Sequence, residues 1–126
     1  NLSRQVHGDD PERTSYTYKR AKANCDLRTG DVRDLAIVSR LVEEANAVIH
    51  LAAETGTGQS MYALSNYCEV NVTGTAVVME AIAKRSQPIA KVIVASSRAV
   101  YGEGKYSCVT HGPRYPDSRL ERDMRE

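Results

Sequence analysis

The stretch VIVASSRAVYG, residues 92–102, decides the fold class of this 126-residue chain. It begins with β-branched residues that are typical of a buried strand, and then turns abruptly polar at Ser96, Ser97 and Arg98. In an open α/β sheet, ligands bind in the crevice outside the carboxyl ends of the strands. The two serines therefore stand where a site would lie, although one strand does not establish it.

Further strands and helices alternate on the amino-terminal side of this stretch. The apolar run at residues 47–53 predicts another buried strand, and residues 25–27 predict a short third one. Apolar residues at helical spacing after the N-cap residue Asp34 predict a helix over about 34–46, and another is expected over about 60–85. This order predicts an α/β fold: a parallel three-stranded sheet, with helices on both faces and all strand ends at one edge.

Charge and composition exclude several classes of function. The chain has 17 basic and 16 acidic residues, so we expect neither nucleic acid nor a membrane as its partner. The apolar runs are far shorter than the ~20 residues that span a bilayer, and we recognise no secretion leader. Three scattered cysteines suit a reducing compartment, so a cytoplasmic protein is expected.

The two ends of the chain differ from its middle. Residues 1–22 are polar and are broken by Gly8 and Pro11, which predicts a surface loop with one short helical turn. Residues 107–126 are polar and contain prolines, and we interpret them as a polar insertion. The length fits one domain, which we take to be residues 1–126.

Four stretches carry a resemblance to a known family: GDVRD (30–34), VIHLAA (48–53), NVTGT (71–75) and VIVASSRAVYG (92–102). In this order and spacing they resemble the extended short-chain dehydrogenase/reductase superfamily, specifically its NAD-dependent nucleotide-sugar epimerases and dehydratases. NLSR (1–4) is similar to the turn after the second strand of such enzymes. ETGTGQSMY (54–62) and YGEGKY (101–106) look most like the dTDP-L-rhamnose 4-epimerase branch.

The resemblance implies an incomplete Rossmann-type fold, in which the chain is the middle of an enzyme of about 300 residues. The first two strands and the glycine-rich pyrophosphate loop would precede Asn1. The catalytic Tyr-x-x-x-Lys and the C-terminal substrate lobe would follow Glu126. Tyr101 and Lys105 have the same spacing, but the glycines between them disfavour the helix that this catalytic pair needs.

The family reaction is a transient hydride transfer between NAD and a sugar carbon, which we expect to be C4. The resemblance places Ser97 at the hydroxyl that holds the reacting oxygen and makes it the candidate catalytic residue. The alternative is a strand-end serine that caps local backbone. The residues expected to contact NAD are Asn1, Asp31, Val32, Leu51, Ala52, Ala53, Asn71, Val94, Ala95 and Ser96. Those expected to contact the nucleotide sugar are Glu54, Thr55, Gly56, Ser97 and Arg98.

Several of these assignments have alternatives. Asp31 is either an acceptor for the adenine amino group or a turn residue. A mid-helix asparagine facing the core usually forms hydrogen bonds, and the resemblance implies that Asn71 braces neighbouring loops near the cofactor. Arg98 and the alanine after it replace the acid pair of the family's 4,6-dehydratases, which disfavours dehydration. Cys108 and His111 could be half of a zinc site, although structural zinc needs four ligands, and we assign no metal.

The sequence thus favours the middle portion of an NAD-dependent nucleotide-sugar epimerase that is a homodimer in its full-length form. One alternative is an NAD(P)-dependent nucleotide-sugar reductase or dehydrogenase, which releases an oxidised or reduced product. Another is a non-catalytic NAD(P)-binding regulator of the same fold. A last one is a structural remnant, whose unpaired sheet edges would be a liability for solubility. The alternatives differ in whether a Tyr-x-x-x-Lys follows residue 126. We expect the chain alone to be inactive.

Overall fold

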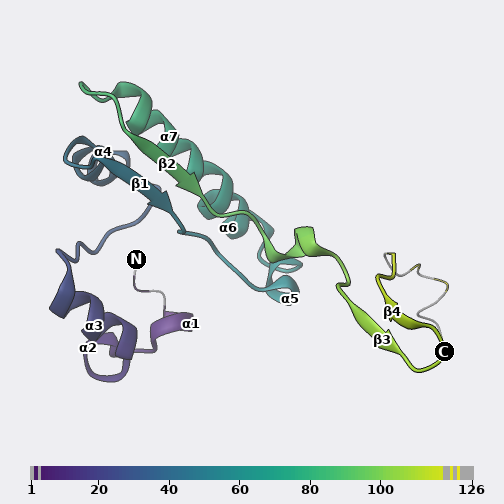
Figure 1. Ribbon diagram of the computed structural model, residues 1–126. Helices are drawn as coiled ribbons and strands as arrows, with labels where there is room; N and C mark the ends of the chain where they lie inside the picture. The colour runs from purple at the N-terminus through teal and green to yellow at the C-terminus, as the bar shows by residue number, and fades with distance from the viewer. Residues whose placement is uncertain (1, 3, 118–119, 121, 123–126) are drawn as a thin grey trace. The chain divides into compact units, whose positions relative to one another are not determined.

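The computed structural model describes residues 2, 4–117, 120 and 122. The chain divides into two compact units, Asn1–Val94 and Ala95–Glu126, and each is described by itself. The first unit is an α/β arrangement, and the second contains a short β-hairpin (Figure 1). No helix in the described ranges is long and apolar enough to cross a bilayer. Asn1 lies outside the described residues.

The sheet of the first unit consists of β1 (Ala47–His50) and β2 (Lys91–Val94). The two strands are parallel, with Val48 opposite Val92 and Ile49 opposite Ile93. This confirms the predicted parallel pairing of these two segments. The carboxyl ends of both strands therefore lie at the same edge of the sheet, which is where a parallel sheet places its ligands.

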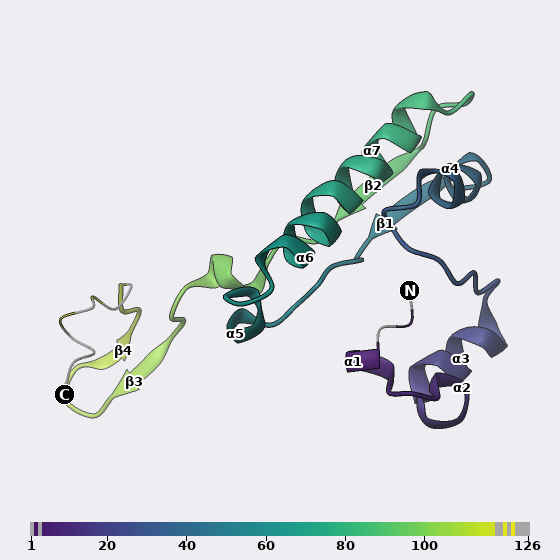
Figure 2. The same cartoon turned by 180° about the vertical axis from the view of Figure 1, so that it is seen from behind.

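Two helices cover one face of this sheet. They are α4 (Leu35–Glu43) and α7 (Gly74–Lys84), which lie on the same side of the strand pair in both views (Figures 1 and 2). A cluster of buried side chains holds them together, formed by Val38 and Val42 of α4 with Val78 and Ala81 of α7. Val48 of β1 packs against this cluster. The core of the first unit therefore lies between α4, α7 and β1.

The predicted helix over 34–46 is confirmed as α4, and its first turn shows why it begins where it does. The carboxylate of Asp34 accepts hydrogen bonds from the backbone N–H groups of Ala36 (2.9 Å) and Ile37 (3.1 Å). Those two donors have no partner within the helix, so the cap stabilises the first turn by about 1 kcal/mol.

The segment predicted as a helix over 60–85 is helical but not uniform. It comprises α5 (Thr57–Ser60), α6 (Leu64–Cys68), a π-helical turn (Glu69–Thr73) and α7. The wider π-helical turn rotates the residues after it, so that the buried positions become Val70, Gly74 and Val78, whereas Thr73 is exposed. Helical spacing in the sequence predicts Thr73 on one buried face with Val70, Val77 and Ala81, and for Thr73 this prediction is wrong.

Residues 25–27 do not form the predicted third strand. Among the residues that the structure describes, helices cover one face of the sheet and not the predicted two. The Asp26 carboxylate forms two hydrogen bonds with the guanidinium of Arg28, at 2.8 and 2.7 Å, and the segment has no ladder partner. Ile49 and Ile93, on the face opposite the helices, are 63% and 46% exposed. The strands therefore have the apolar composition that is typical of a sheet covered on both faces, but α4 and α7 cover only one face.

The region expected as a loop, residues 1–22, contains the helices α1 (Arg4–His7) and α2 (Pro11–Thr14) and most of α3 (Tyr16–Asn24). The helical turn expected around Arg13–Lys22 is confirmed as α3, whereas α1 and α2 were not predicted. Capping residues explain α2 and α3. Asp10 accepts from the backbone N–H of Arg13 at 3.2 Å, and Ser15 accepts from that of Tyr18 at 3.3 Å. Proline suits the first helical position, so Pro11 starts α2 rather than interrupting a helix.

The second unit begins directly after β2. A 3₁₀-helix (Arg98–Tyr101) is followed by an antiparallel hairpin of β3 (Tyr106–Cys108) and β4 (Gly112–Arg114). Between Tyr101 and Lys105 the backbone passes through two glycines with positive φ, 64° at Gly102 and 81° at Gly104. The structure therefore confirms that no helix aligns Tyr101 with Lys105.

Gly74 allows the start of α7 to pack closely against the loop before α4. A Cβ at this position would lie 2.6 Å from Cγ1 of Val32. We expect Gly74→Ala to destabilise the chain by about 1–3 kcal/mol, because overpacking exceeds the ~0.5–1 kcal/mol gain in helix propensity. Urea unfolding of the wild type, Gly74→Ala, Val32→Ala and the double variant measures it. The double variant should recover stability through a favourable coupling energy, and simple additivity of the two changes would contradict the contact.

Candidate functional site

The loop of residues 51–56, directly after β1, is fixed at the carboxyl edge of the sheet by one asparagine. The side-chain oxygen of Asn71 accepts from the backbone N–H of Glu54 at 2.8 Å, and its amide nitrogen donates to the Glu54 carbonyl at 3.1 Å. One side chain thus forms hydrogen bonds with both the backbone N–H and the backbone carbonyl of one residue, Glu54. This is the loop brace that the sequence predicted for Asn71.

Asn71 is itself held by a chain of hydrogen bonds that begins in β1. The Thr75 hydroxyl donates to the Asn71 carbonyl at 2.6 Å and lies 3.0 Å from Nε2 of His50, which is buried. Because the single hydroxyl proton goes to the carbonyl, Thr75 accepts from His50, which places the ring proton on Nε2. The strand, the π-helical turn and the loop are therefore joined by one polar network.

A tyrosine fastens the other end of the same loop. The Tyr67 hydroxyl shares its one proton between the carbonyls of Thr55 (2.8 Å) and Gly56 (3.0 Å). Tyr67 lies four residues before Asn71, so both side chains project from one side of the same helical segment. Together they hold the backbone of residues 54–56.

The loop before α4 is attached to the same π-helical turn. Asp31 binds the guanidinium of Arg33 through both carboxylate oxygens, at 2.9 Å each, and also accepts from the Arg33 backbone N–H at 2.9 Å. Arg33 in turn donates to Glu69 at 2.8 Å. The Asp31 carboxylate raises the pKa of the Arg33 guanidinium above its ordinary value, so Arg33 stays charged. Asp31 thus has the geometry of a turn residue, and the structure brings its loop and the 51–56 loop to one helical turn.

The residues expected to face a cofactor are accessible. Ala52 and Ala53 are exposed, and Leu51 is 68% exposed. Glu54, which is expected to contact the sugar, is half-buried. The small side chains of Ala52 and Ala53 leave the backbone at the carboxyl end of β1 open to close approach. Val32 differs, because it is half-buried and packs against the core cluster.

In the second unit, Ser97 begins the 3₁₀-helix. Its hydroxyl accepts from the backbone N–H of Ala99 at 3.1 Å, so the capping interaction that the sequence left open is present. A serine hydroxyl that accepts one hydrogen bond still has its own proton to donate. Capping therefore fixes the oxygen and leaves its donor function intact. Ala95, Ser96 and Arg98 are exposed.

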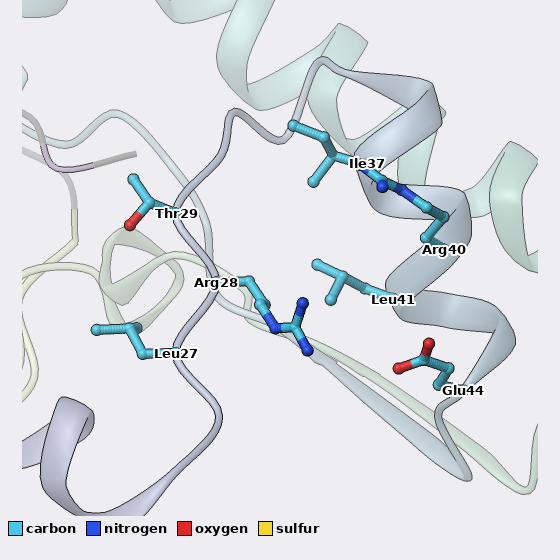
Figure 3. Close-up of a pocket in the computed structure, with 7 residues that line it drawn as sticks. All are labelled: Leu27, Arg28, Thr29, Ile37, Arg40, Leu41 and Glu44. Atoms are coloured by element: carbon cyan, nitrogen blue, oxygen red, sulfur yellow. The ribbon is translucent and has the colours of Figure 1, made fainter.

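The pocket in Figure 3 belongs to the first unit. It has a volume of about 380 Å³ and is located between the 27–29 segment and the outer side of α4. None of the residues expected to contact NAD or the sugar lines it. Its lining comprises Leu27, Arg28, Thr29, Ile37, Arg40, Leu41 and Glu44. We therefore place the candidate site at the strand ends and not in this pocket.

Five residues that shape the site were not predicted from the sequence: Arg33, His50, Tyr67, Glu69 and Thr75. A signal existed for two of them. Tyr67 shares the helical spacing of Asn71, and His50 is the one polar residue within the apolar run 47–53. The ion pair between Arg33 and Glu69 joins residues that are far apart in the chain, so local spacing could not indicate it.

Removing the Tyr67 hydroxyl tests how firmly the loop is held. We expect Tyr67→Phe to lower the free energy of unfolding by about 0.5–1.5 kcal/mol and to raise amide hydrogen exchange in residues 54–60, because two carbonyls lose their donor. Tyr62 is 89% exposed and serves as the matched control, so Tyr62→Phe should change neither quantity. Equal exchange in both variants would show that Tyr67 does not restrain the loop.

Comparisons with known proteins show the family of the chain. Residues 2–118 match the family described as the NAD dependent epimerase/dehydratase family. The chain is 36% identical to a dTDP-L-rhamnose 4-epimerase of Burkholderia thailandensis over 121 residues, which is 94% of this chain and 32% of that protein. It is 30% identical to a dTDP-glucose 4,6-dehydratase of Streptomyces antibioticus over 114 residues, covering 90% of this chain and 31% of that protein.

A UDP-glucose 4-epimerase of Neisseria meningitidis is also similar, at 34% identity over 76 residues, covering 59% of this chain and 22% of that protein. The chain thus spans about a third of the length of the Burkholderia and Streptomyces relatives. These relatives are enzymes that act on nucleotide sugars, and the family match covers both loops held by the π-helical turn. The chain belongs to the NAD dependent epimerase/dehydratase family, with its Rossmann-like α/β fold.

Proposed function

We propose that this chain is the middle portion of an NAD-dependent nucleotide-sugar 4-epimerase. The observation that carries the proposal is the 36% identity to a dTDP-L-rhamnose 4-epimerase along 94% of the chain. The anchored, accessible loop after β1 supports it, because a cofactor needs a fixed backbone with little side-chain bulk at this edge. We further propose a cytoplasmic homodimer for the full-length protein.

The proposed cofactor position follows the strand ends. Ala52 and Ala53 would lie along NAD, and Val94, Ala95 and Ser96 would lie near the nicotinamide. Asp31, oriented by Arg33, would accept from the adenine amino group, while Leu51, Val32 and Asn71 shape the surroundings. When bound, NAD accepts a hydride from the sugar carbon and returns it to the same carbon.

Ser97 would donate its hydroxyl proton in a hydrogen bond to the reacting sugar oxygen, while the Ala99 N–H fixes the direction of the hydroxyl. Glu54, Thr55, Gly56 and Arg98 would contact the nucleotide sugar. Dehydration would need an acid and a base next to Ser97, and Arg98 followed by an alanine supplies neither. The residues present therefore favour epimerisation over the reaction of the 4,6-dehydratase relatives.

This proposal is tested by identifying the product and by measuring whether NADH is formed or consumed during the reaction. The full-length protein should convert a dTDP-6-deoxyhexose into its 4-epimer with no net change in NADH absorbance. A reductase or dehydrogenase would change NADH in step with product, and a non-catalytic regulator would bind NAD in calorimetry without turnover. Either result would overturn the epimerase assignment, as would release of a 4-keto-6-deoxy product.

A further inference from the structure

The hairpin of the second unit brings a thiol and an imidazole together. Cys108 ends β3, and His111 precedes the first residue of β4. Sγ of Cys108 and Nδ1 of His111 are 3.3 Å apart. Gly112, which follows His111 and pairs with Cys108 in the hairpin, has a positive φ of 69°, a conformation that glycine adopts without strain. The pair lies outside the residues assigned to NAD and the sugar.

This separation matches the geometry of two neighbouring ligands on one metal ion. Zinc bonds of ~2.3 Å to thiolate and ~2.0–2.1 Å to imidazole, at a tetrahedral angle, place sulfur and nitrogen roughly 3.6 Å apart. The hairpin therefore needs an opening of only a few tenths of an ångström to admit the ion. A thiolate and an imidazole are also the ligands that structural zinc prefers.

The second unit has no apolar core to hold this hairpin. None of its described residues is buried, and Val109, between Cys108 and His111, is fully exposed. Units of fewer than about 40 residues usually need a disulfide, a metal or a partner for stability. Cys108 forms no disulfide. A metal ion on the Cys108–His111 pair would supply the missing constraint.

We propose that Cys108 and His111 are half of a structural zinc site that a second copy of the hairpin completes. The described residues contain no group of three or more His, Cys, Asp or Glu side chains placed to hold a metal, so the remaining ligands come from elsewhere. A second copy supplies an identical pair about a two-fold axis, which gives a Cys₂His₂ set. As each zinc–sulfur bond forms, the thiol loses its proton to the buffer, with no change in oxidation state.

Cobalt(II) titration of the 126-residue chain, under reducing conditions, tests this site. We expect a thiolate-to-cobalt charge-transfer band with tetrahedral d–d bands, saturating at about one metal per two chains and displaced by zinc. Sedimentation velocity should show a dimer with metal and a monomer after chelation. The nitrogen chemical shifts of the His111 ring should change upon zinc binding, which reports ligation independently of assembly.

Variants separate this site from adventitious binding. Cys108→Ser and His111→Ala should each abolish the saturating band and the metal-dependent dimer. Cys25 and Cys68 are exposed free thiols outside the hairpin, so Cys25→Ser and Cys68→Ser should leave both unchanged. The absence of a thiolate band, or its persistence in Cys108→Ser, would overturn the site. Saturation at one metal per monomeric chain would contradict the second copy as the source of the other ligands.

Discussion

In the full-length protein, Ser97→Ala is expected to lower kcat for the nucleotide sugar by roughly 10²-fold, with little change in NAD affinity. The loss removes a hydroxyl that donates to the reacting oxygen. It also removes the acceptor of the Ala99 N–H, a local cap worth about 1 kcal/mol. Steady-state kinetics together with thermal unfolding of the same preparation measure both effects.

Two further substitutions separate the capping role of Ser97 from the catalytic one. Ser97→Thr keeps a hydroxyl and the capping oxygen, and it should recover much of the rate. Ser97→Asn keeps an oxygen that can cap the backbone but has no hydroxyl, so its stability should return while its rate stays low. Turnover of Ser97→Ala at the wild-type rate would show that Ser97 is only a cap.

The second large effect is expected at Asn71. Asn71→Ala leaves the backbone N–H and carbonyl of Glu54 without their partner, and both are partly buried. We expect a loss of about 1–3 kcal/mol in the free energy of unfolding. In the full-length protein, weaker NAD binding should follow, because the loop of residues 51–56 is no longer held. Urea unfolding and NAD calorimetry measure the two consequences.

Asn71→Asp and Asn66→Ala are the controls for this prediction. Aspartate can still accept from the Glu54 N–H but cannot donate to its carbonyl, so an intermediate loss is expected. Asn66 is exposed on α6, and its replacement by alanine should leave both quantities unchanged. If Asn71→Ala bound NAD as tightly as the Asn66→Ala control, the loop brace would have no part in the cofactor site.

The sequence predicted those parts of the fold that depend on local patterns. Each of these patterns involves only a few neighbouring residues. The strands around Val48 and Ile93 and the helix start at Asp34 were predicted correctly. The sheet face around Ile49 was not, because burial depends on which distant segments cover a strand. The π-helical turn was not predicted for a related reason. Asn71 within this turn forms tertiary contacts with Glu54, and the spacing of apolar residues along the sequence does not indicate such contacts.

The site shows the same division. The position of Asn71 within a helix predicted that its side chain has a partner, the family resemblance implied that it braces a loop, and the structure supplies the partner in Glu54. The sequence left Asp31 either as a turn residue or as an acceptor for the adenine amino group. Its bond to Arg33 shows the geometry of a turn residue and does not test the adenine contact. The bond from Arg33 to Glu69 spans 36 residues, so only the folded chain brings the two together.

The fate of the hydrogen at C4 tests the central claim most directly. The full-length protein would be given a nucleotide sugar labelled with deuterium at C4, in unlabelled water with unlabelled NAD, and both epimers would be analysed by mass spectrometry. Hydride removal and return within one site predicts that the product epimer keeps deuterium at C4. Loss of the label to solvent, or its accumulation in free NADH, would contradict the account.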